Sequence, residues 1–94
     1  MATVPFGDDF EWDDAKAASN VKKHRVSFVE AVSAVSAPGA IALADTIHPD
    51  RVITLGISER SRVLLVVTTE AGERTRIISA RRATAAERAI YEEG

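Results

Sequence analysis

The chain has 94 residues, of which 46% are apolar and 28% are charged, a balance typical of a folded soluble domain and not of a disordered chain. It has no cysteine, which excludes a disulfide framework, a thiolate zinc site and a cysteine nucleophile. The formal net charge of −2 argues, by itself, against a nucleic-acid ligand.

The N-terminal residues predict little regular structure. We expect residues 1–9 to form a flexible lead-in and residues 10–94 to form a single domain that opens with a short strand near 10–12. The start is acidic and lacks the basic and then apolar pattern of a secretory signal. No apolar run approaches the roughly 20 residues that a membrane-spanning helix needs, so we expect a cytoplasmic protein.

Two helices are predicted next. Asp13 or Asp14 is a good N-cap for a helix that runs to about His24, and Lys16, Asn20 and Lys23 share one stripe of it. The pattern Ser27-x-x-Glu30 predicts a capping box at the start of a second helix. Apolar residues follow it at helical spacing, and Pro38-Gly39 ends it.

The apolar period then changes from about 3.6 to 2, which indicates strands. We expect four of them, at 40–44, 51–58, 62–69 and 74–82, with a tight hairpin at 71–73. The pattern Thr84-x-x-Glu87 predicts a last helix to about residue 93. The predicted fold class is therefore α+β: two N-terminal helices packed on a roughly four-stranded antiparallel meander sheet, with a C-terminal helix.

The basic residues are unevenly distributed. Residues 51–88 contain eight Arg and four Glu, a balance of +4, and no Lys. Arg is the side chain best suited to forked binding of phosphate. The simpler interpretation is an Arg-rich composition on a solvated face, with weak pairs such as Arg88 with Glu92 and Arg74 with Glu73.

The strand order allows these arginines to converge. In a meander, Arg62 at the start of one strand lies near the end of the last strand, and Arg88 and Tyr91 share a face of the last helix. The geometry thus allows one pocket formed by Arg62, Arg76 or Arg81, Arg82, Arg88 and Tyr91. Guanidinium groups can stabilise the charge of a phosphorane-like transition state, and RNA brings its own 2′-OH nucleophile.

Two long segments, FEWDDAKAASNVKKHRVSF (10–28) and RIISARRATAAERAIYEE (76–93), resemble the BrnT family of toxins from bacterial type II toxin–antitoxin modules. The matching positions are Phe10 to Asp13, Lys16, Asn20, Lys23-His24, Val26-Ser27-Phe28, Leu55-Gly56-Ile57-Ser58, Arg76 to Arg81, Glu87-Arg88 and Tyr91-Glu92. The resemblance implies a RelE-like fold and metal-free RNA cleavage that inhibits translation. It also implies neutralisation by a BrnA-like ribbon-helix-helix antitoxin, through which the toxin would bind promoter DNA.

The resemblance and the arginine pattern together give a set of candidate site residues. As catalytic residues we expect His24, Arg62, Arg76, Arg81, Arg88 and Tyr91, and as RNA-binding residues Lys16, Lys23 and Arg82. No metal site and no cofactor are expected. His24 can equally cap the first helix, and Lys16 can simply face water.

Two departures from the family pattern bear on activity. Arg25 replaces a Gly expected in the left-handed conformation just after the first helix, and residues 35–38 lack the usual Phe-x-Asp-Pro. With the acidic net charge, these departures favour an alternative: a weak or inactive toxin homologue that binds its antitoxin as a co-repressor. A generic RNA-binding domain outside any toxin system is a third interpretation.

Overall fold

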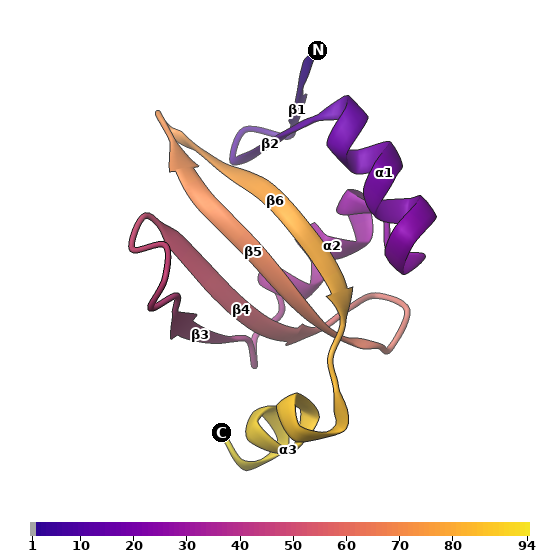
Figure 1. The fold of residues 1–94 in the computed structure, drawn as a ribbon, viewed down its shortest axis with the longest axis vertical. Coiled ribbons are helices and arrows are strands. Elements are labelled where there is room, and N and C mark those ends of the chain that lie inside the picture. The colour runs from indigo at the N-terminus through magenta and orange to yellow at the C-terminus, as the bar shows by residue number, and fades with distance from the viewer. Residues whose placement is uncertain (1) are drawn as a thin grey trace.

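The computed structural model describes residues 2–94, which form one six-stranded sheet and three helices (Figure 1). In chain order the elements are β1 (Thr3–Phe6), β2 (Phe10–Asp13), α1 (Asp14–His24), α2 (Phe28–Val35), β3 (Ile41–Ala44), β4 (Arg51–Ile57), β5 (Val63–Ala71), β6 (Arg74–Arg82) and α3 (Ala85–Glu93). The predicted α+β class, the three helices and the antiparallel β3-β4-β5-β6 meander are confirmed.

The sheet is larger than the sequence predicted. Its strand order is β1-β2-β6-β5-β4-β3, so two N-terminal strands extend the meander beyond β6. β2 pairs with β6 in parallel, which corrects the expected four-stranded, purely antiparallel sheet. β1 pairs with β2 antiparallel and lies within residues 1–9, where a flexible lead-in was expected. The Phe6 ring stacks on Trp12, with ring centroids 5.3 Å apart, which gives this edge strand an apolar anchor.

The core lies between one face of the sheet and the helices α1 and α2. Its buried residues come from both layers: Trp12, Val26, Phe28, Ala31, Ala34, Leu64, Val66, Ile77 and Ala80. Trp12 packs edge-on against Phe28 and belongs to this core. The backbone of α2 lies so close to β4 that a Cβ atom on Gly56 would be 2.1 Å from the carbonyl oxygen of Ala34. Only glycine fits at this crossing.

A β-bulge changes which side chains of β6 face the core. Val67 pairs with Ser79, but the next residue, Thr68, pairs with Ile77, so Ile78 is the extra residue. Ile77 and Ala80 therefore both point into the core, whereas simple alternation had placed them on opposite faces. The bulge was not predictable from apolar spacing, because a single inserted residue reverses the alternation after it.

The helix ends match the sequence signals, with one exception. The side chains of Asp13, Ser27 and Thr84 accept hydrogen bonds at the starts of α1, α2 and α3, and the capping box of α3 is complete. At α2 the Ser27 half of the predicted box is present, but the Glu30 carboxylate is directed elsewhere. α3 follows β6 at one end of the sheet and has no buried residue (Figure 1). None of the helices within residues 2–94 is long and apolar enough to cross a membrane.

Candidate functional site

Two hollows lie beside the C-terminal half of β6, and each is lined by basic side chains. The lysine hollow, about 200 Å³ in volume, is lined by Lys16, Ser19, Asn20, Lys23, His24, Ile78 and Ser79. The arginine hollow, about 130 Å³ in volume, is lined by Ser61, Arg62, Val63, Arg82, Ala83 and Arg88. Ser79 and Arg82 are three residues apart on β6, so one strand contributes to the lining of both hollows.

The lysine hollow is positioned by the side chain of Asn20. β2 ends early, so the backbone of β6 around Ala80 has no neighbouring strand, and the buried Asn20 amide takes its place. Its oxygen accepts from the Ala80 N–H at 3.1 Å, and its nitrogen donates to the carbonyl oxygens of Ala80 at 2.7 Å and Val26 at 2.9 Å. These bonds hold α1 alongside the strand, as Figure 1 shows.

Helical spacing brings two basic residues, Lys16 and Lys23, to the hollow beside Asn20. Lys16, Asn20 and Lys23 occupy positions i, i+4 and i+7 of α1, so they share the face turned toward β6. His24, the last residue of α1, lines the same hollow. Neither lysine forms an ion pair with any of residues 2–94, so their charges are available to an anion.

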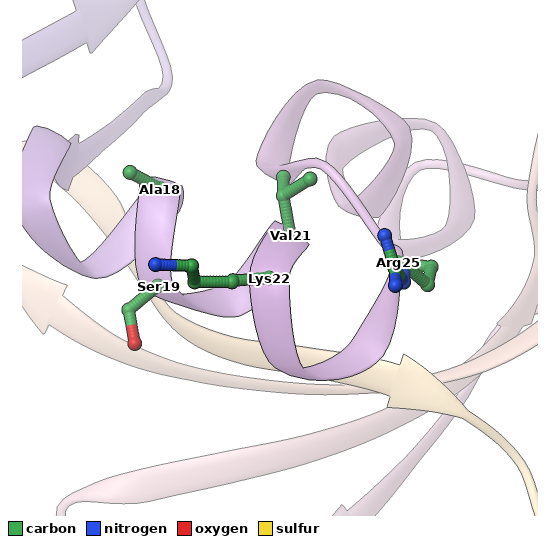
Figure 2. Close-up of a pocket in the computed structure, with 5 residues that line it drawn as sticks. All are labelled: Ala18, Ser19, Val21, Lys22 and Arg25. Atoms are coloured by element: carbon green, nitrogen blue, oxygen red, sulfur yellow. The ribbon is translucent and has the colours of Figure 1, made fainter.

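Lys22, the residue before Lys23, does not line the lysine hollow, and Figure 2 shows its surroundings. Lys22 lines a shallow depression on another face of α1, about 590 Å³ in volume, together with Ala18, Ser19, Val21 and Arg25. Its side chain runs back along the helix toward Ser19. The depression and the lysine hollow share Ser19, but Lys22 lines only the depression and Lys23 lines only the hollow.

The arginine hollow forms where β5 begins and β6 ends. Leu64 pairs with Arg82, and the Ala83 N–H donates to the carbonyl oxygen of Val63 at 2.9 Å, which closes the strands next to the 59–61 turn. The helix α3 contributes Arg88 to the lining of this hollow. Within residues 2–94, neither the Arg82 nor the Arg88 side chain has an ion-pair or hydrogen-bond partner. The predicted proximity of Arg62 and Arg82 is present in this hollow.

Arg62 differs from its neighbours because a buried carboxylate holds it. Its Nε and Nη2 donate to Glu30, whose side chain is 2% exposed, and Nη2 also donates to the carbonyl oxygen of Arg25. Burial alone would raise the pKa of the Glu30 carboxyl. Hydrogen bonds from Arg62 and Ser58 outweigh this effect, and the pKa lies below its ordinary value. The network fixes the β4–β5 turn to α2 and to the end of α1.

Two other predicted arginines are paired elsewhere. Arg76 donates to Glu11 on β2, and Arg81 forms a two-pronged pair with Glu87 at 2.8 and 2.9 Å. The hydrogen bonds from Arg81 lower the pKa of the Glu87 carboxyl to about 2, against the effect of burial. Neither Arg76 nor Arg81 lines the arginine hollow. The bulge and the strand pairing place Arg81 beside Leu65, on the face opposite the core.

Tyr91 and His48 lie away from both hollows. The Tyr91 hydroxyl lies close to Gly39, since a Cβ atom on that glycine would be 3.3 Å from it. The single pocket that the sequence allowed is therefore divided: Arg62, Arg82 and Arg88 share one hollow, while Tyr91 lies beside the turn before β3. His48 is in the β3–β4 loop, where its Nδ1 lies 3.5 Å from Asp45.

Sequence reasoning gave no role in the site to two residues that shape it, Asn20 and Glu30. Asn20 had a signal, because a single Asn inside a helix, four residues from Lys16, is unfavourable unless its amide has a partner. Glu30 matched a capping pattern, which hid its pairing with Arg62. Residues 2–94 contain no group of three or more His, Cys, Asp or Glu placed to hold a metal ion.

Comparisons with known proteins agree on one family. The sequence model described as "Ribonuclease toxin, BrnT, of type II toxin-antitoxin system" matches residues 12–87. The crystal structure of the Brucella abortus ribonuclease toxin BrnT superposes with a TM-score of 0.64 at 24% identity, over 78% of this chain and 92% of that one. This likeness supports the fold. No curated protein sequence matches the chain.

Proposed function

The chain belongs to the BrnT family of ribonuclease toxins of type II toxin–antitoxin systems, and from this premise we propose that it is a metal-independent endoribonuclease. The observation that carries the proposal is the convergence of Lys16, Lys23 and His24 on one hollow beside β6. Two ammonium groups there can hold a phosphodiester, and an imidazole can exchange protons at neutral pH.

The chemistry follows from what RNA provides. With the phosphodiester in the lysine hollow, the 2′-OH attacks phosphorus and loses its proton to a base. The bond from phosphorus to the 5′ oxygen then breaks, and that oxygen takes up a proton. The products are a 2′,3′-cyclic phosphate and a 5′-hydroxyl. We assign one proton transfer to His24, and we assign Lys16 and Lys23 to the negative charge that builds up on the phosphate oxygens.

The purified chain should cleave RNA in the presence of EDTA and leave cyclic-phosphate ends. A positioned acid or base contributes about 10²- to 10⁴-fold, so His24→Gln should lower the cleavage rate by about 100-fold or more. Lys23→Ala should also slow cleavage, by tenfold or more, whereas Lys22→Ala, on another face of the same helix, should not. Equal loss for both lysine variants would show that general charge, and not this hollow, supports activity.

The ion pairs of the site favour a second candidate function. Glu30, Glu11 and Glu87 neutralise three of the arginines expected to bind phosphate. A chain with this charge balance could hold its antitoxin, and through it a promoter, without cutting RNA. It would then form a tight complex but would not arrest growth when expressed alone.

The partner implied by the family is an antitoxin. We propose that it is a BrnA-like protein with a ribbon-helix-helix DNA-binding part, encoded next to this chain. Co-expression of the neighbouring small reading frame should relieve growth arrest and co-purify with the chain. Growth arrest without that partner separates the nuclease from the co-repressor, because only the nuclease is toxic alone.

A further inference from the structure

The arginine hollow has no group suited to acid–base chemistry, yet it presents unpaired positive charge at the end of β6, the strand that also lines the lysine hollow. We propose that it is a second phosphate subsite, which holds another backbone phosphate of the RNA strand that is cleaved in the lysine hollow. The proposal rests on RNA being the ligand of the lysine hollow, and it adds a minimum substrate length to the proposed function.

The guanidinium groups that line the arginine hollow are either unpaired or held in a fixed position. Arg82 and Arg88 have no partner within residues 2–94, so a phosphate would not have to displace a carboxylate. Arg62 is held by Glu30 through Nε and Nη2, while its Nη1 makes no hydrogen bond to the described residues. A fixed guanidinium with one free nitrogen loses little entropy when it binds an anion.

The arginine hollow is small, about 130 Å³ in volume, and guanidinium groups dominate its polar lining. Contacts to phosphate carry no direct sequence information, so the subsite should bind the backbone without selecting a base.

The number of phosphates in an oligonucleotide sets the length requirement. A dinucleotide has one internal phosphate, so it can occupy only one hollow. A longer oligonucleotide has further phosphates and can place one in each hollow.

The test uses 2′-O-methyl oligonucleotides of two to five nucleotides, which lack the 2′-OH nucleophile and cannot be cleaved. Their dissociation constants should fall by tenfold or more at one length step and then level off. The double variant Arg82→Ala/Arg88→Ala should remove this step and leave dinucleotide binding within about twofold. The salt slope of log K for the longer oligonucleotides should fall by about 0.7, the value for one phosphate contact.

Arg51→Ala is the matched control, because Arg51 is at the far end of β4 and pairs with Thr69. It should leave the length step intact. Both target arginines are largely solvent-facing, and unchanged circular dichroism would show that the variants fold. The subsite is refuted if the double variant weakens short and long oligonucleotides equally, or if Arg51→Ala removes the step. Cleavage of RNA without any length step would refute the subsite alone, whereas a length step without cleavage would refute the nuclease alone.

Discussion

Arg25 adopts a backbone conformation that its side chain disfavours. It is the C-cap of α1, with φ of 59° and ψ of 33°, in the left-handed region where glycine is usual. The conformation is needed because the chain must turn at once to bring Val26 into the core and to present the Arg25 carbonyl to Arg62. The sequence pattern predicted this conformation, and the structure confirms it.

Replacing Arg25 by glycine should therefore stabilise the fold. An L-residue in the left-handed region costs about 1–2 kcal/mol, and the extra freedom of glycine in the unfolded chain offsets part of this. Arg25→Gly should raise the free energy of unfolding by about 0.5–1 kcal/mol in urea denaturation. Arg25→Ala is the control, since it removes the same charge but keeps the strain. If alanine stabilises as much as glycine, repulsion with nearby lysines is the cause instead.

At the scale of elements, an ion pair links the helix α3 to the strand β6. None of the residues of α3 is buried, but Glu87 accepts two hydrogen bonds from Arg81 of β6 while also capping the helix at Thr84. One carboxylate thus serves both the helix start and its link to the sheet. Because Arg88 belongs to the same helix, this link also sets the position of one wall of the arginine hollow.

The ion pair between Glu87 and Arg81 predicts that the stability of the fold depends on pH in the acid range. The pKa of the Glu87 carboxyl is about 2 in the folded chain and about 4.3 for an unfolded one, so its stabilisation is complete above pH 4.3. It is lost as the pH falls from about 4.3 to about 2. Glu87→Gln should lose about 1 kcal/mol at neutral pH, and its difference from the wild type should shrink over that interval.

The measurement is urea unfolding at a series of pH values between 7 and 2. Glu30, whose pKa is also lowered, contributes acid sensitivity to both proteins, so only the difference between them reports on Glu87. Glu92→Gln, on the same helix and without a partner in residues 2–94, should behave as the wild type. A difference that stays constant with pH would mean that Glu87 acts only as a neutral cap.

At the scale of the whole molecule, local signals predicted elements well and side-chain partners poorly. The caps at Asp13, Ser27 and Thr84 depend on near neighbours in sequence, and all three were found. The pairing of β2 with β6 joins residues about 65 positions apart, and no local pattern encodes it. The same holds for Glu30 with Arg62, a pair that neutralises one member of the expected arginine pocket.

The net charge of the chain does not reveal where its cations gather on the surface. The chain has a net charge of −2, yet the cations at the two hollows are largely free of acidic partners. At physiological ionic strength, interactions between exposed charges are screened beyond about 8 Å, so a phosphate near β6 responds to these cations and hardly to distant carboxylates. The acidic total is therefore compatible with RNA binding at this surface.

Two variants with the same net charge test whether position or total charge governs RNA binding. Lys23→Ala/Arg88→Ala and Lys22→Ala/Arg51→Ala each remove two cations and change the net charge from −2 to −4. The first removes one cation from each hollow, so binding of a five-nucleotide 2′-O-methyl RNA should weaken at least tenfold. Its salt slope should fall by no more than about 1.4, the value for two lost phosphate contacts, because each hollow keeps at least one cation. The second should bind within about twofold of the wild type, and equal weakening of both would mean that net charge controls binding.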